Sequence, residues 1–242
     1  MEKLVIIGYG PGGEALLTDE AKTAISNAGR VLNTREMPLS DLLAKLGRPV
    51  RESTAVLVSG DSGFFSVTKT IIKEYSELYE IKVTPGVGSI QYLSAKIKKP
   101  YDDAVLVSLH GRDCNIVPKT TYNKKVFALT GGEGGVGEIC RKLCRYGLGD
   151  VTISVGERLS YPDERLVTGK ARELQDMDFD GLSVMYIENP SAADPHMPLN
   201  DADFIRADIP MTKEEIRWLS IQKLGVRPGD VVFDIGAGTG AV

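Results

Sequence analysis

Three glycine-rich segments of the chain have residues suited to holding a ligand close to the main chain. They read GYGPGG at residues 8–13, SGDSGFFS at residues 59–66 and TPGVGSIQ at residues 84–91. Glycine has no Cβ, so the backbone at these positions can approach a ligand closely. In the second segment, Asp61 could pair with a cation and Phe64 could cover an apolar or aromatic group. These features predict a ligand that is held mainly by backbone groups.

The first segment matches G-x-G-x-x-G, the pattern of many dinucleotide-binding turns. In those turns a helix begins among the glycines, and its free amides face the pyrophosphate. Here Thr18, Asp19 and Glu20 favour a helix that begins only after the segment, and Pro11 removes one amide donor. We therefore expect a ligand loop of another kind. A site for a nicotinamide dinucleotide and a plain tight turn remain as alternatives.

Each of the three segments follows a short apolar run that is typical of a buried parallel strand. These runs are Leu4–Gly8, Thr54–Ser59 and Ile81–Thr84. Helical patterns lie between them and continue at Ser89–Ile97, so the chain alternates strands with helices. Such alternation predicts α/β layers around a mainly parallel sheet. Ligands of open α/β sheets bind beyond the carboxyl ends of the strands, so the three segments should line one crevice.

The second half of the chain has strands with fewer helices between them, which predicts a second α/β domain with a mixed sheet. The expected strands are Lys125–Thr130, Val151–Val155, Leu166–Thr168 and Leu182–Ile187. We place the first domain at residues 1–112, with a fifth strand at Ala104–Ser108, and the second domain at residues 113–190.

A proline- and aspartate-rich stretch at residues 191–210 is typical of an interdomain linker. After it, Thr212 and Glu215 form a capping-box pattern that predicts a helix. A predicted strand at Val231–Ile235 then leads into the glycine turn GAGTG. A strand and turn without a following helix cannot bury their faces, so we expect residues 211–242 to be the truncated start of a further domain.

Composition excludes several classes of protein. The 242 residues include 29 Lys and Arg against 33 Asp and Glu, so the net charge of −4 argues against a dedicated nucleic-acid binder. No apolar run is long enough for a membrane span, and no membrane association is expected. The cysteines, Cys114, Cys140 and Cys144, are an odd number and suit a reducing, cytoplasmic setting. We interpret them as apolar thiols and expect no metal site.

Taken in order, the three glycine-rich segments resemble the tetrapyrrole (corrin/porphyrin) methylase family. The usual family pattern is G-x-G-P-G, then a G-D-P-type loop, then P-G-[VI]-S-S. Later motifs are similar to one branch, which methylates C-5 of precorrin-7 or its cobalt form: SLHGR at 108–112, LTGG at 129–132 and VGERLSYP at 155–162. The resemblance covers residues 4–190. Ser62 and Gly88 depart from it, replacing a common Pro and a common Ser or Thr.

The resemblance implies a two-domain fold with its active site in a trough between the domains, and S-adenosylmethionine as the cofactor. It implies that cofactor contacts come from Gly8, Gly10, Pro11, Gly60, Asp61, Phe64, Gly88, Ser89, Leu129, Thr130, Gly156 and Glu157. A tetrapyrrole substrate carries several carboxylates, so Arg112 is our first choice for binding one in a bidentate way. His110 is either a proton acceptor or a structural, hydrogen-bonded histidine. Lys96, Lys98, Lys99 and Arg158 are weaker basic candidates.

The end of the chain resembles a different methyltransferase class. VVFDIGAGTG at residues 231–240 is similar to motif I of class I S-adenosylmethionine methyltransferases, and residues 209–240 are similar to the start of a C-15 methylating, decarboxylating domain of the same pathway. We expect that second activity to be absent from this chain.

The resemblance to the tetrapyrrole methylases also implies a homodimer. The alternatives are a methylase of another corrin position, a diphthamide-pathway methylase, a nicotinamide-dependent oxidoreductase and a module that delivers a tetrapyrrole.

Overall fold

The computed structural model describes residues 2–109, 114–131, 135–195, 197, 199–204, 210–227, 229–238 and 240–241. The chain separates into two compact units, Met1–Ala192 and Ala193–Val242. The division falls within the stretch expected to be a linker, residues 191–210. Within the described ranges, no helix combines the length and the apolar character needed to traverse a bilayer.

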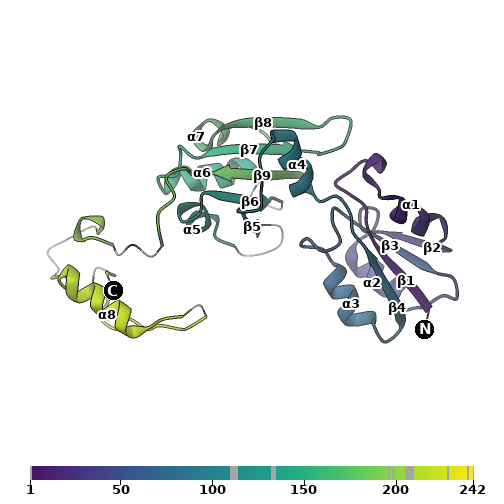
Figure 1. Cartoon of the computed structure of the whole chain (residues 1–242), viewed down its shortest axis with the longest axis horizontal. Helices are drawn as coiled ribbons and strands as arrows, with labels where there is room; N and C mark the ends of the chain where they lie inside the picture. Colours follow the sequence, from purple (N-terminus) through teal and green to yellow (C-terminus); the bar gives the residue numbers. More distant parts are fainter. Residues whose placement is uncertain are drawn as a thin grey trace. The chain divides into compact units, whose positions relative to one another are not determined.

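The first sheet of unit 1 is entirely parallel. Its strands are β1 (Glu2–Gly8), β2 (Arg30–Asn33), β3 (Thr54–Val58) and β4 (Tyr79–Thr84). They lie in the order β2-β3-β1-β4, as Figure 1 shows. This arrangement confirms the parallel sheet that the alternating pattern predicted, and it brings the carboxyl ends of all these strands to one edge.

Helices cover both faces of this first sheet, which is why its central strands, β1 and β3, are largely apolar on both sides. Ile7 of β1 packs in a core beneath α1 (Asp19–Ser26), together with Ala21 of that helix. Ile6 points to the opposite face and packs in a core with residues of α2 (Leu39–Leu46) and α3 (Thr68–Tyr75).

The second sheet of unit 1 is mixed, as predicted. Its strands are β5 (Val105–Ser108), β6 (Lys125–Leu129), β7 (Thr152–Glu157), β8 (Arg165–Lys170) and β9 (Ser183–Glu188). They lie in the order β5-β6-β9-β7-β8. The β5–β6 pair is parallel, whereas β9 is antiparallel to both β6 and β7, and β7 is antiparallel to β8.

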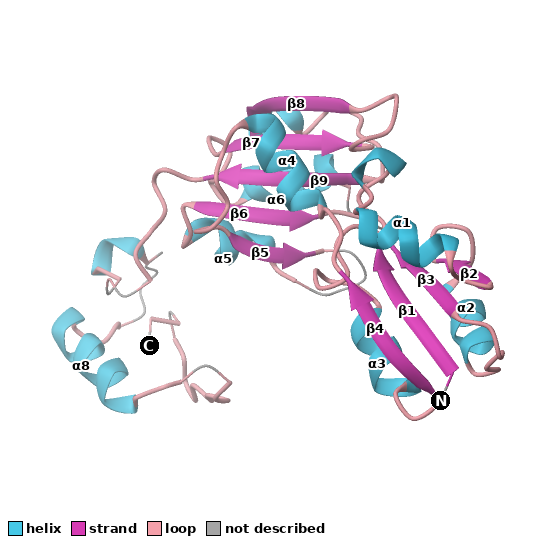
Figure 2. Ribbon diagram, turned by 45° about the vertical axis from the view of Figure 1, so that its right-hand side comes forward, coloured by secondary structure: helices cyan, strands magenta, loops and turns pink. Residues whose placement is uncertain are grey.

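The two faces of the second sheet are covered by helices from different parts of the chain. One face packs on α5 (Ile116–Thr121), α6 (Val136–Arg145) and α7 (Ala171–Leu174). The other face packs on α4 (Ser89–Ile97), as Figure 2 shows, and Leu93 lies in the core that they share. Because α4 directly follows the last strand of the first sheet, it joins the two sheets into one unit.

The change from one sheet to the other comes earlier in the chain than we expected. The segment Ala104–Ser108 was assigned to the first domain, at residues 1–112, but β5 pairs with β6 in the second sheet. The physical reason is that α4 already packs on the second sheet, so the strand that follows it joins that sheet.

Unit 2 contains a short 3-10 helix at Asp201–Asp203 and the helix α8 (Glu214–Leu224). The helix predicted after Thr212 is confirmed, but the capping box is not, because Lys213 is the N-cap residue and makes no side-chain capping bond. The strand predicted at Val231–Ile235 is also wrong. Val231 is 79% exposed and Ile235 is 95% exposed, and the segment pairs with no other strand among the described residues. An apolar run without a pairing strand does not form a sheet.

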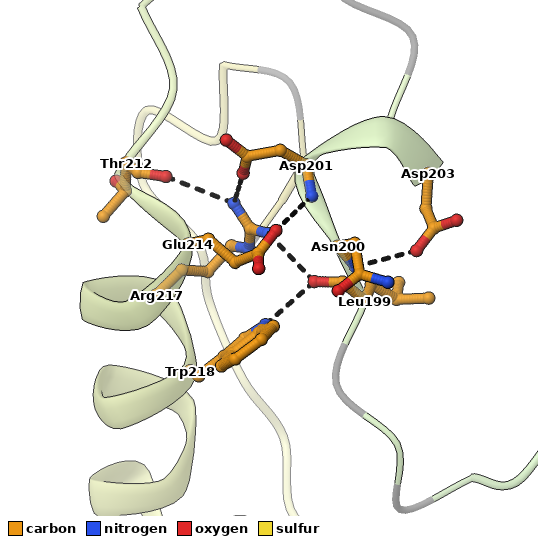
Figure 3. Close-up of polar contacts among 8 residues, drawn as sticks. All are labelled: Leu199, Asn200, Asp201, Asp203, Thr212, Glu214, Arg217 and Trp218. Carbon is orange, nitrogen blue, oxygen red and sulfur yellow. Dashed lines mark hydrogen bonds and ion pairs between the residues drawn. The ribbon is translucent and has the colours of Figure 1, made fainter.

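Arg217 of α8 holds unit 2 together. Its side chain is only 1% exposed. Its Nη1 donates to Asp201 Oδ1 at 2.8 Å and its Nη2 donates to the carbonyl of Leu199 at 2.9 Å (Figure 3). Trp218 Nε1 donates to the same carbonyl at 2.8 Å. The segment before α8 is therefore fastened to the helix through one buried guanidinium and its neighbouring indole.

Candidate functional site

The first and second glycine loops, at residues 8–13 and 59–66, are joined by backbone hydrogen bonds. Gly10 N donates to Gly60 O at 3.1 Å, and Gly60 N donates to Gly10 O at 2.8 Å. Both glycines have positive φ, 77° at Gly10 and 68° at Gly60, a conformation that other residues seldom adopt. The two loops therefore form one continuous surface beyond the ends of β1 and β3.

The third glycine loop, at residues 84–91, lies against the other two. A Cβ placed on Gly86 would be 2.6 Å from the carbonyl oxygen of Gly60, which is far closer than a real Cβ can come. The same Cβ would also meet the backbone of Gly8. The three loops thus converge, as their positions at parallel strand ends predicted, and glycine is required where they touch.

Asp61 fastens the second loop to the third. One carboxylate oxygen accepts from Gly63 N at 2.8 Å, and the other accepts from Gly86 N at 3.1 Å. Ser62 adds a second link, because its buried hydroxyl donates to the carbonyl of Thr84 at 2.9 Å. The serine that replaces the usual family proline therefore has a partner of its own. The Asp61 carboxylate that we expected beside a cation has a bridging role between the loops.

The chain after the first loop does not form the helix of a dinucleotide-binding turn. A 3-10 helix occupies Glu14–Leu16, and α1 begins at Asp19, where the Thr18 hydroxyl accepts from Ala21 N at 3.1 Å. The free amides of α1 therefore lie beyond Thr18 and outside the glycine turn. This geometry differs from a dinucleotide fingerprint in the feature that binds pyrophosphate.

Gly88 is the N-cap residue of α4, and Ser89 is the first residue of that helix. A Cβ on Gly88 would meet the side-chain oxygen of Gln91. Gln91 therefore fills the space into which the usual family serine or threonine would project. Ser89 is half-buried at the junction between the third loop and the helix.

The site residues expected on the second sheet are mostly engaged in packing. Leu129 and Phe64 pack against the core beneath α4, and the Phe64 ring centroid lies 6.2 Å from that of Phe127. Thr130 is buried, and its hydroxyl donates to the carbonyl of Ser183 at 2.5 Å. Phe64 belongs to the second glycine loop, so its packing against Phe127 connects that loop to the second sheet.

Gly156 and Glu157, also expected near the cofactor, lie at the end of β7. A Cβ on Gly156 would be 2.7 Å from the side chain of Leu159, so this glycine permits close packing. The buried carboxylate of Glu157 accepts from Asp180 N at 2.6 Å and from the Arg165 guanidinium. Both residues hold the strand and its following turn in place.

A loop of the second sheet contacts the first glycine loop directly. Gly13 N donates to the hydroxyl of Ser160 at 2.8 Å, and a Cβ on Gly12 would be 2.5 Å from the ring of Tyr161. Ser160 has a φ of 66°. Nothing in the local sequence indicates these contacts, because the partners are more than 140 residues apart and no pattern links them.

Three of the four weaker basic candidates form ion pairs, and the fourth, Lys98, is the C-cap residue of α4. Lys96 lies 2.8 Å from Glu164, Lys99 pairs with Glu188, and Arg158 lies 2.6 Å from Asp163. Burial alone would raise the pKa of Glu164, but hydrogen bonds from the Lys96 ammonium and the Ser160 backbone amide lower it below its ordinary value.

Arg35, which follows β2, was not expected in the site. Its Nη2 donates to Gly10 O at 2.5 Å and its Nη1 donates to Gly12 O at 3.3 Å.

The residues expected to be catalytic, His110 and Arg112, lie outside the described residues. Pro11 is half-buried within the first loop.

Comparison with known proteins agrees with this geometry. A precorrin-6Y C(5,15)-methyltransferase (decarboxylating) of Sinorhizobium sp is 31% identical over 267 residues, an alignment that covers 99% of this chain and 63% of that protein. The cobalt-precorrin-7 C(5)-methyltransferase of Salmonella typhimurium is 27% identical over 179 residues, or 67% of this chain and 88% of that protein. The chain thus spans less than two thirds of the length of the Sinorhizobium protein.

Solved structures share the fold. A uroporphyrin-III C-methyltransferase from Thermus thermophilus, in complex with S-adenosylhomocysteine, superposes with a TM-score of 0.61 at 20% identity, covering 83% of this chain and 99% of that one. The family model for tetrapyrrole (corrin/porphyrin) methylases matches residues 48–175, which include the second and third glycine loops and most of the second sheet. The chain belongs to the tetrapyrrole (corrin/porphyrin) methylases.

Proposed function

We propose that this chain is a methyltransferase that moves a methyl group from S-adenosylmethionine to a carbon of a corrin precursor. The proposed acceptor is C-5 of precorrin-7 or of cobalt-precorrin-7. Support comes from the family and from similar proteins whose names specify C-5 methylation of such precursors. The Salmonella protein is matched over most of its length, which favours the C-5 activity for unit 1.

The convergence of the three glycine loops is the observation that carries this proposal. Gly8 and Gly86 leave no room for side chains where the loops meet, and Gly60 has a positive φ of 68°, so the three loops pack backbone against backbone at one edge of the sheet. S-adenosylmethionine supplies an electrophilic methyl group when bound. The proposed contacts are those named for the cofactor above, with Asp61 fixing the loops and Phe64 anchoring the second loop to the second sheet.

Little acid–base chemistry is required of the protein in this reaction, because the methyl donor is already activated. The main contribution is alignment of the two reacting groups, which is worth about 7–11 kcal/mol in favourable cases. We assign Arg112 to a substrate carboxylate and His110 to a proton acceptor.

Isothermal titration with S-adenosylhomocysteine tests the cofactor assignment. We expect saturable binding with one site per chain, and no binding of NADH, because α1 begins outside the glycine turn. Incubation with precorrin-7, cobalt-precorrin-7 and earlier precursors, read out by mass spectrometry, tests the acceptor. Saturable NADH binding without binding of S-adenosylhomocysteine would contradict the proposal. Methyl transfer to a different precursor would move the assignment to another corrin position.

We further propose that the chain is a cytoplasmic homodimer and that residues 211–242 begin a class I methyltransferase domain. The free cysteines Cys114, Cys140 and Cys144 suit a reducing compartment. The alignment with the Sinorhizobium protein runs through 99% of this chain, which supports the assignment of the tail. Light scattering coupled to gel filtration measures the oligomeric state, and a monomer at micromolar concentration would contradict the dimer.

A further inference from the structure

Two arginines lie at opposite ends of β2: Arg30 begins the strand, and Arg35 follows its last residue, Asn33. Arg30, the first residue of the strand, donates to the carbonyls of Lys45 and Arg48, each at 3.2 Å, and to the Thr54 hydroxyl at 3.1 Å. Arg35, just beyond the strand, donates to atoms of the first and second glycine loops instead. Both side chains therefore donate several hydrogen bonds, but of the two only Arg35 contacts the glycine loops.

The contacts of Arg35 span both loops. Its Nη2 and Nη1 reach the carbonyls of Gly10 and Gly12, and its Nε donates to Ser59 Oγ at 3.1 Å. The guanidinium carbon also lies 5.1 Å from the centroid of the Tyr9 ring. One planar group therefore contacts two carbonyls and the tyrosine ring of the first loop, and connects that loop to the start of the second loop.

The loops have a particular need for such a group. Glycine loses more conformational freedom on ordering than any other residue, so an unsupported GYGPGG segment would have to be ordered at the expense of ligand affinity. Gly10 O accepts from both Gly60 N and Arg35, so the hydrogen bonds that join the two loops share an atom with the arginine. Lysine cannot replace this role, because it lacks the fixed fork of donors that reaches three acceptors at once.

We propose that Arg35 is a positioning residue, which holds the first and second glycine loops in their ligand-binding conformation before the cofactor arrives. This inference rests on the proposed function, since it assumes that the loops bind S-adenosylmethionine. Arg35 acts through Gly10, Gly12 and Ser59 and needs no contact with the reacting atoms.

The test compares Arg35→Ala with Arg30→Ala, a matched control at the other end of β2. We expect Arg35→Ala to raise the Kd for S-adenosylhomocysteine about tenfold or more. Without the arginine, the loops become ordered only when the ligand binds, and the entropic cost of that ordering lowers the affinity. Arg30→Ala should lower the Tm to a similar or larger extent and leave the Kd within about twofold of wild type. In steady-state assays, Arg35→Ala should raise the KM for S-adenosylmethionine more than it lowers kcat.

Arg35→Lys and added guanidinium separate positioning from general stability. Lysine keeps the charge but not the fork, so Arg35→Lys should still raise the Kd, by at least about threefold, and this variant decides the matter if Arg35→Ala fails to fold. Guanidinium at non-denaturing, millimolar concentration should restore part of the affinity of Arg35→Ala and none in Arg30→Ala.

Two results would overturn the inference. The first is a Kd of both Arg35 variants within twofold of wild type, and the second is an equal loss of affinity in Arg30→Ala. Failure of the proposed function is distinguishable from either, because it would appear as no binding of S-adenosylhomocysteine to the wild-type chain.

Discussion

The backbones of Gly8 and Gly86 pack directly against each other, and neither position has room for a side chain. A Cβ on Gly8 would be 2.5 Å from Gly86 N, and a Cβ on Gly86 would be 2.5 Å from Gly8 O. The atoms in the way are backbone atoms, which cannot rotate aside. The contact therefore fixes the distance between the ends of β1 and β4, and with it the spacing of the first and third glycine loops.

Gly8→Ala should destabilise the chain, because the added methyl group forces the two strand ends apart. We expect the free energy of unfolding in urea to fall by about 1–3 kcal/mol, as for other overpacked sites. Gly181→Ala is the control, since no atom lies within 4 Å of a Cβ at that position and its change should stay within about 0.5 kcal/mol. Equal stability of the two variants would show that the loops can separate without loss.

Asp61→Ala should both destabilise the chain and weaken cofactor binding. It removes the acceptors of two backbone amides, Gly63 N and Gly86 N, so the free energy of unfolding should fall by about 1–3 kcal/mol. Asp61→Asn should not restore the link fully, because an amide has one acceptor oxygen. The control is Asp150→Ala, which breaks an exposed ion pair with Arg172 and should change stability by less than about 1 kcal/mol.

The contribution of Glu164 to stability should disappear in acid. Its pKa in the folded chain lies below the ordinary value of 4.5, so its stabilising effect is present above that value and is lost as the pH falls through the folded pKa. We therefore expect wild type and Glu164→Gln to differ most in Tm at neutral pH and to converge once the pH has fallen below the folded pKa. Glu138→Gln, which breaks an exposed pair within α6, should show a small difference throughout. A gap that widens in acid would contradict this assignment.

Arg217→Ala should release the segment before α8 in unit 2. Loss of its charged hydrogen bonds to Asp201 and Leu199 should cost about 2 kcal/mol or more in the stability of this unit. The chain has a single tryptophan, Trp218, so its fluorescence reports on unit 2 alone. We expect a red shift of the emission in Arg217→Ala and none in the control Lys223→Ala. An unchanged spectrum would indicate that the indole–Leu199 hydrogen bond holds without Arg217.

Local patterns predicted elements well where the pattern was strong. The bounds of α4 agree with the expected range Ser89–Ile97, and β6 ends one residue before the end of the expected strand Lys125–Thr130. The helix α2 was missed, although Pro38 and leucines at helical spacing within Leu39–Leu46 indicate it. The strand expected at Val231–Ile235 fails for a different reason, because strand formation depends on a pairing strand that a local pattern does not reveal.

The site was predictable in outline and not in its side-chain contacts. Parallel strands end at one edge, so the meeting of the glycine loops follows from the strand order alone. The bond from Gly86 N to Asp61 joins residues 25 positions apart, and the contact of Gly13 with Ser160 joins two sheets. The role of Arg35 was hidden for the same reason, because a basic residue after a strand has many alternative partners.

The strand order of the second sheet also has a consequence for biosynthesis. β9, the last strand of unit 1 to leave the ribosome, is inserted between β6 and β7. Until Ser183–Glu188 has been synthesised, both of these neighbours present open hydrogen-bonding edges, which are prone to pair with other chains. The second sheet of the nascent chain is therefore complete only after β9 has been synthesised. The first sheet, in contrast, has all its strands once residue 84 has emerged from the ribosome.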